Sequence, residues 1–172
     1  MADRLRWREP TSLLALTWGT YLDRYVIGLV LIIGGSIHLL GSNTWTLLIL
    51  LTGAVAALVG WSILPSKGWR RVVAASLGMI ASLALLTGPL SIWVLALSLV
   101  SWMLVRHRPA RSYLVVVFPI AAGVILPHYF TDFSGMLPAL AIGGAVLVAA
   151  AWLARMIAAS APVPMPCEGA IR

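Results

Sequence analysis

The stretch YVIGLVLIIGGSIHLLG, residues 25–41, decides the fold of this chain. Every residue from 26 to 37 is apolar or small. At about 1.5 Å of rise per residue, a helix of this length with part of its flanks crosses a hydrocarbon core of roughly 30 Å. The stretch therefore predicts a membrane-spanning helix, after which the chain must stay in the bilayer or leave it through a polar loop.

The composition of the whole chain supports this interpretation. Hydrophobic residues make up 61% of the 172 residues, charged residues only 10%, and the mean hydropathy is +0.99. An ordinary soluble domain has about 25% charged residues. The single cysteine, Cys167, excludes an intrachain disulfide and any C-x-x-C metal or redox motif. We expect one membrane-embedded domain and no folded extramembrane domain.

The apolar runs predict an all-α, polytopic membrane protein built as a six-transmembrane-helix bundle. The expected spans cover residues 25–41, 44–64, 72–88, 89–105, 112–127 and 136–157. The third and fourth runs would make one unusually long helix, but Gly88-Pro89 breaks it. Pro119 is expected to kink the fifth span.

Two flanking segments lie outside this 25–157 transmembrane domain. Residues 1–24 form a basic leader whose apolar stripe is either an amphipathic interfacial helix or an extension of the first span. That stripe comprises Leu14, Trp18, Tyr21, Leu22 and Tyr25. Residues 158–172 carry three prolines at alternating positions, which predicts a disordered cytoplasmic tail.

The positive charges indicate the orientation. With six spans, all 12 Lys and Arg residues fall on one side of the membrane and none falls in the loops of the other side. The positive-inside rule then places both termini in the cytoplasm, in a multi-pass protein of a bacterial-type cytoplasmic membrane. The net charge of +7 is spread over several loops, which excludes a nucleic-acid patch and favours contacts with anionic lipids, worth about 1 kcal/mol each. The expected lipid contacts are Lys67, Arg70, Arg71, Arg106, Arg108 and Arg111.

Small residues recur every four positions in several predicted spans. Gly53 and Ala57 follow this spacing, as do Ala74 and Gly78. Gly28 and Gly35 share a helix face one heptad apart. Small residues at these spacings let helix backbones approach closely in a membrane, so they predict tight packing within or between subunits.

Three ionisable residues are expected on the outer side. His38 is the only ionisable residue inside a predicted span, and His128 and Asp132 follow the fifth span. If residues 128–132 are helical, His128 and Asp132 share a face and could bind a ligand or a divalent metal, or pass a proton. The alternative is that these are ordinary interfacial residues. Which metal would bind is left open, and no cofactor is predicted.

Three classes of function remain open. The scarcity of polar residues in the spans favours a non-catalytic partner, an accessory subunit, or an assembly or regulatory factor of another membrane protein, or self-association. The alternative is a transporter of small solutes or lipids, or a solute-binding membrane component. The size and the cytoplasmic termini are similar to those of the substrate-binding components of energy-coupling-factor importers, although the first span lacks their alanine-spaced coupling motif. A membrane enzyme ranks third, because the chain has no H-E-x-x-H motif and no acidic run for a metal.

Overall fold

The computed structural model describes residues 19–42, 45–66 and 68–160, and these ranges are helical without any strand. The α-helices are α1 (Tyr21–Leu40), α2 (Leu47–Ile63), α3 (Trp69–Ala84), α4 (Leu95–Val105), α5 (Val117–Tyr129) and α6 (Met136–Ala159). Four short 3₁₀ segments connect or extend them: η2 (Leu85–Thr87), η3 (Pro89–Val94), η4 (Ala110–Val116) and η5 (Phe133–Gly135). The predicted all-helical fold is confirmed.

Several of these helices are long and apolar enough to cross a membrane. In the described ranges these are Tyr21–Leu40, Trp69–Thr87, Ala110–Tyr129 and Met136–Ala159. Leu47–Ile63 and Pro89–Val105 are shorter apolar helices. Leu47–Ile63 has 17 residues, which is at the lower end of the range of roughly 17–25 that spans a bilayer. The chain is therefore a membrane-embedded helical protein.

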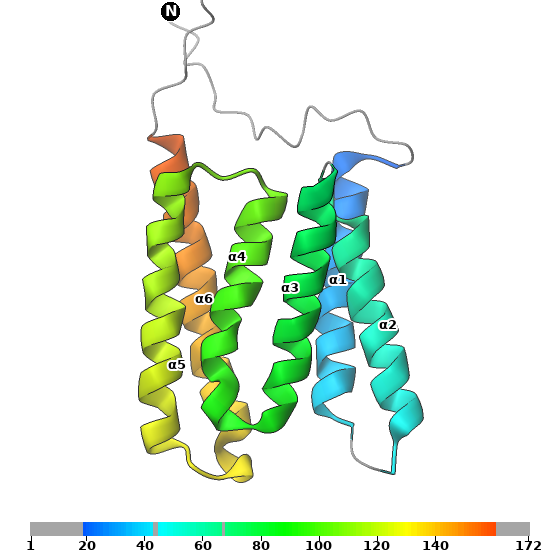
Figure 1. Cartoon of the computed structure of the whole chain (residues 1–172), viewed down its shortest axis with the longest axis vertical. Coiled ribbons are helices and arrows are strands. Elements are labelled where there is room, and N and C mark those ends of the chain that lie inside the picture. Colours follow the sequence, from blue (N-terminus) through cyan, green and yellow to red (C-terminus); the bar gives the residue numbers. More distant parts are fainter. Residues whose placement is uncertain (1–18, 43–44, 67, 161–172) are drawn as a thin grey trace, which may run out of the picture.

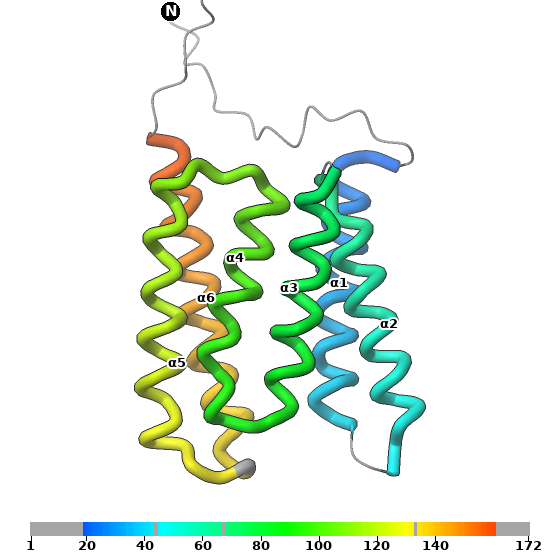
Figure 2. The backbone as a smooth tube through the Cα atoms, in the orientation of Figure 1, coloured from blue at the N-terminus to red at the C-terminus, as the bar shows by residue number. Residues whose placement is uncertain are grey.

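The helices are arranged as successive pairs that follow chain order from one edge of the molecule to the other. Figure 1 shows α1 and α2 at one edge, α5 and α6 at the opposite edge, and α3 and α4 between them. The packing agrees, because α1 packs mainly on α2, α3 packs on α2 and α4, and α6 packs on α4 and α5. The backbone trace in Figure 2 shows that α3 and α4 form a hairpin in the middle of this row.

Many small side chains are buried in the interior, and many large apolar side chains point outward. Ala57, Ala74 and Ala81 are completely buried. In contrast, Val148 and Trp152 on α6 are each 67% exposed. In water this distribution would be unfavourable, but in a bilayer large apolar side chains face lipid and small ones let helices approach.

Helices α1 and α2 pack closely against each other through glycine. A Cβ atom added to Gly35 would lie 2.5 Å from the backbone nitrogen of Ala57 and 2.7 Å from the carbonyl oxygen of Gly53. One added to Gly60 would lie 2.8 Å from the carbonyl oxygen of Gly28. A Cβ on Gly34, the neighbour of Gly35, would meet nothing within 4 Å. The prediction that small residues mediate close packing is confirmed for this pair.

The predicted break between the third and fourth apolar runs is also confirmed. Gly88 has a φ of +102°, a conformation that side chains of L-residues rarely adopt, and it separates η2 from η3. Pro119 lies in the first turn of α5. The chain switches from the 3₁₀ geometry of η4 to α-helix just before it.

Helix α1 begins at Tyr21, before the first residue of the predicted span. The Thr20 hydroxyl accepts the N–H of Asp23 at 3.2 Å, and the Asp23 carboxylate accepts the N–H of Thr20 at 3.0 Å. This capping box satisfies N–H groups at the helix start. Residues 21–24 thus extend the first apolar helix, whereas residues 1–18 of the predicted leader and the tail from 161 lie outside the described residues.

Candidate functional site

The described arginines gather at one end of the molecule. The alternating direction of the helices brings the starts of α1, α3 and η4 together with the ends of α2, α4 and α6, as Figure 1 shows. This basic end, as we call it, contains Arg24, Arg70, Arg71, Arg106, Arg108, Arg111 and Arg155. None of the described arginines lies at the opposite end.

Two arginines bind backbone carbonyls where α2 ends. The Nε of Arg24 donates to the carbonyl oxygen of Ile63 at 3.2 Å. The Nη2 of Arg71 donates to the carbonyl oxygen of Ser66 at 2.6 Å. The last carbonyls of a helix lack intrahelical partners and carry partial negative charge, so a cation there is favourable. These bonds connect α1 and α3 to the α2–α3 turn.

The end of α4 is a Schellman motif with histidine in the position usually taken by glycine. The N–H of His107 donates to Leu104 at 3.2 Å and the N–H of Arg108 donates to Met103 at 3.1 Å. His107 has a φ of 53°, in the left-handed region that costs an L-residue about 1–2 kcal/mol. The motif thereby holds the His107 side chain in a defined position.

His107 contacts Arg70 of α3. The Nη1 of Arg70 lies 3.0 Å from the Nδ1 of His107. A guanidinium is always a donor, so Nδ1 accepts and the imidazole proton resides on Nε2. Burial, and secondly the charge of Arg70, lower the pKa of His107 below its ordinary value. The imidazole is therefore neutral near pH 7, and its buried Nε2–H has no acceptor in the part of the chain that the structure describes.

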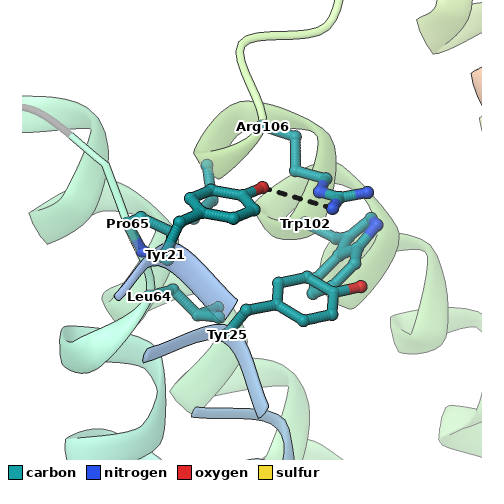
Figure 3. Close-up of a pocket in the computed structure, with 7 residues that line it drawn as sticks. Tyr21, Tyr25, Leu64, Pro65, Trp102 and Arg106 are labelled. Atoms are coloured by element: carbon teal, nitrogen blue, oxygen red, sulfur yellow. Dashed lines mark hydrogen bonds between the residues drawn. The ribbon is translucent and has the colours of Figure 1, made fainter. Parts of the chain in front are cut away.

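Arg106 is turned toward the aromatic residues of α1 and α4. Its guanidinium carbon lies 4.8 Å from the ring centroid of Tyr25 and 5.0 Å from that of Trp102. Its Nη2 donates to the Tyr21 hydroxyl at 3.4 Å, as Figure 3 shows. Such cation–π contacts are worth about 0.5–2 kcal/mol depending on burial. Arg106 thus connects the end of α4 to the start of α1.

Among the described residues, carboxylates are scarce around the basic end. Asp23 is bound to Thr20, and Asp132 belongs to the opposite end. Within the described ranges, neither Arg70 nor Arg71 forms an ion pair. The Nε of Arg71, the Nε2 of His107 and the hydroxyl of Ser66 are buried and have no hydrogen-bond partner among the described residues. A surface with many N–H donors and few acceptors is chemically suited to an anion.

Comparisons with protein-family models, with curated proteins and with solved structures find no match for this chain. Its function is therefore argued from the arrangement of its own residues.

The predicted outer residues lie at the opposite end. His38 is exposed in the last turn of α1, and His128 is exposed in the last turn of α5. Helix α5 ends at Tyr129, so the helical i, i+4 arrangement of His128 and Asp132 that the sequence suggested does not form. No three His, Cys, Asp or Glu side chains in the described part of the chain are placed to hold a metal ion. A ligand or proton site shared by His38, His128 and Asp132 stays a prediction.

The predicted lipid contacts differ in their surroundings. Arg111 is exposed, Arg70, Arg71 and Arg106 are half-buried, Arg108 is buried, and Lys67 lies outside the described residues. Sequence reasoning did not single out His107 or Ser66. His107 lies between two arginines of a basic loop, and this position could have indicated a role for it. Nothing in the sequence indicates a role for Ser66.

An apolar cavity of about 550 Å³ lies at the opposite end. It is bounded by the end of α1, by η2 and by the start of α6. Ile37, Leu40 and Leu86 line it, together with Met136 and Leu140. A cavity lined in this way suits a hydrocarbon group.

Proposed function

We propose that the chain is a six-span integral membrane protein whose basic end and both termini face the cytoplasm. The observation that supports this orientation is the segregation of every described arginine to one end of the helices. In multi-pass proteins such a bias marks the cytoplasmic side. The two shorter apolar helices then serve as the second and fourth spans.

Within this topology, we propose that the protein acts as a non-catalytic partner of another membrane protein. Several hydroxyl side chains inside the helices donate to carbonyls of their own helix, as Thr52 does to Leu48 at 3.0 Å and Ser101 to Leu97 at 2.8 Å. Ser62 and Ser82 do the same. These hydroxyl protons are engaged, so they are poorly placed to replace the water around a polar solute. This favours a docking role over transport of polar solutes.

The experiment is purification of the tagged full-length chain in mild detergent, followed by mass spectrometry of the proteins that accompany it. A membrane protein recovered in a fixed stoichiometry, and absent from a purification of an unrelated tagged membrane protein, is the expected result. A chain recovered alone or only with non-stoichiometric contaminants would contradict the partner role.

The apolar cavity supports a second candidate, transport of a lipid or another apolar molecule. We propose to test it by reconstituting the protein in vesicles and measuring transbilayer movement of a fluorescent lipid. Leu86→Trp would fill the cavity and should slow the movement, whereas Val148→Trp on the outer face of α6 should leave it unchanged. No movement above that of empty vesicles would refute this candidate.

A further inference from the structure

We propose that the basic end contains a built site for a phosphate group, formed by Arg70, Arg71 and His107. The phosphate could belong to a lipid headgroup or be free inorganic phosphate, since both present the same oxygen acceptors. Such a site differs from general electrostatic attraction of anionic lipids. It predicts that phosphate binding depends on particular N–H donors more than on the net positive charge.

The first argument is the set of buried donors. Arg71 uses Nη2 on the Ser66 carbonyl, which leaves its buried Nε–H without an acceptor. His107 accepts from Arg70 through Nδ1, which leaves its buried Nε2–H without an acceptor. Buried N–H groups in folded proteins are almost always bonded, so two such donors at one end call for an acceptor that the described residues do not supply.

The second argument is charge. Arg70 and Arg71 contribute two permanent positive charges, and within the described residues no carboxylate pairs with either of them. Guanidinium groups bind phosphate oxygens through several directed hydrogen bonds, and such charge-assisted bonds are stronger than neutral ones. A carboxylate has two oxygens, whereas a phosphate group can accept from more donors at once. The arrangement therefore favours phosphate.

The third argument is that the donors are held in place. Arg71 is bound to the main chain of the α2–α3 turn, and the hydroxyl of Ser66, a residue only 2% exposed, is likewise buried without a partner there. His107 is held by the Schellman motif in a left-handed conformation that is unusual for histidine. Local strain of this kind is concentrated at binding sites, where neighbouring structure maintains it.

The test is binding of lipids to the purified full-length protein in neutral detergent, measured by native mass spectrometry. The probes are phosphatidate, phosphatidylglycerol and the phosphate-free lipid diacylglycerol, each with and without millimolar inorganic phosphate. The central variant is Arg71→Gln. Its matched control is Arg155→Gln, which removes the same charge from an exposed position on α6 at the same end. Arg71→Lys keeps the charge and removes the Nε–H.

We expect Arg71→Gln and Arg71→Lys to weaken binding of the phosphate lipids about tenfold or more, and Arg155→Gln about twofold or less. Displacement by inorganic phosphate would identify free phosphate as a ligand, and its absence would identify the lipid headgroup. Equal losses in Arg71→Gln and Arg155→Gln would overturn the proposal in favour of diffuse attraction. Wild-type binding of diacylglycerol equal to that of phosphatidate would overturn it too.

A second variant covers the case in which changes at Arg71 impair folding. His107→Asn removes the Nε2–H without changing the charge near pH 7.5, and asparagine tolerates the left-handed backbone. We expect at least a threefold loss of binding, and wild-type binding would overturn the role of His107. The inference rests on the proposed orientation in one respect only, namely which leaflet of the membrane supplies the bound lipid. Binding in detergent depends on neither orientation nor a partner, so the two proposals can fail separately.

Discussion

The two ends of the bundle use their polar residues in opposite ways. At the basic end, Arg24 and Arg71 bind carbonyls at and beyond the end of α2, and Arg106 contacts aromatic rings. At the opposite end, His38 and His128 are exposed, and the packing surrounds an apolar cavity of about 550 Å³. Positive residues in a membrane protein are commonly interpreted as markers of topology. Here several of them also hold neighbouring helices together.

The two ends also differ in their unpaired hydrogen-bond donors. Arg71 and His107 bury N–H donors that nothing in the described chain accepts, and both lie at the basic end. The cavity at the other end offers mostly hydrocarbon. The comparison predicts that an anion binds at one end and an apolar group at the other.

The largest expected effect is on stability. It tests whether phosphate binding at the basic end depends on the side chains of that end or on the close packing of α1 and α2. Gly35→Ala should lower the free energy of unfolding by about 3 kcal/mol, because its Cβ meets backbone atoms of α2 at 2.5 Å and 2.7 Å. Gly34→Ala should change it by less than about 1 kcal/mol, because its Cβ meets nothing. Thermal unfolding in detergent measures both. Binding of phosphate lipids per folded molecule should be the same in both variants. Loss of binding in Gly35→Ala would show that the packing of α1 on α2, and not the side chains of the basic end alone, determines binding.

A smaller effect of opposite sign is expected for His107→Gly. Glycine adopts the left-handed conformation at the end of α4 without the steric penalty of histidine, so unfolding should require up to about 1 kcal/mol more. Phosphate-lipid binding should fall, because the Nε2–H is lost. Unfolding and lipid binding are measured on the same preparation. A parallel loss of stability and binding would indicate that His107 has only a structural role.

The stability of the protein should depend on pH through His107 at the basic end. The pKa of His107 is lowered from the ordinary 6.5 by burial and by the adjacent Arg70. As pH falls through 6.5, the unfolded chain takes up this proton before the folded chain does, so the folded protein loses stability. The midpoint temperature should be lower at pH 5.5 than at pH 7.5, and His107→Asn should reduce the difference. The same dependence in the variant would assign it to another group.

The smallest effect is expected at the opposite end. His38→Gln and His128→Gln should each change the free energy of unfolding by less than about 0.5 kcal/mol, because both side chains are exposed. Elemental analysis of the same samples shows whether metal accompanies the wild-type protein and the two variants. A metal that accompanies the wild-type protein and disappears in both variants would contradict this expectation and establish the outer site.

The helices of this fold could be predicted from the sequence because lipid imposes long apolar runs, and Gly88-Pro89 marked the break between two of them. The sequence also predicted the clustering of basic residues between the runs. Their partners could not be predicted. The contacts of Arg24 with Ile63 and of Arg70 with His107 join segments 39 and 37 residues apart, and only the packing of the helices brings them together.

The ends of the helices were less predictable than their centres. The predicted start at residue 25 overlooked the capping box of Thr20 and Asp23, although both residue types are typical of helix starts. The expected helical face of His128 and Asp132 required α5 to continue past Tyr129, where the structure ends the helix. Local backbone hydrogen bonds decide such positions, and hydropathy contains little information about them.

The central claim is that the two ends lie on opposite sides of a membrane, with the basic end in the cytoplasm. Cysteine accessibility tests it most directly, on a Cys167→Ser background with Ala110→Cys at the basic end or Thr131→Cys beyond α5. Both positions are exposed, and α5 lies between them. In right-side-out vesicles, a membrane-impermeant maleimide should label Thr131→Cys at once and Ala110→Cys only after permeabilisation. Labelling of both from the same side, or the reverse pattern, would contradict the account.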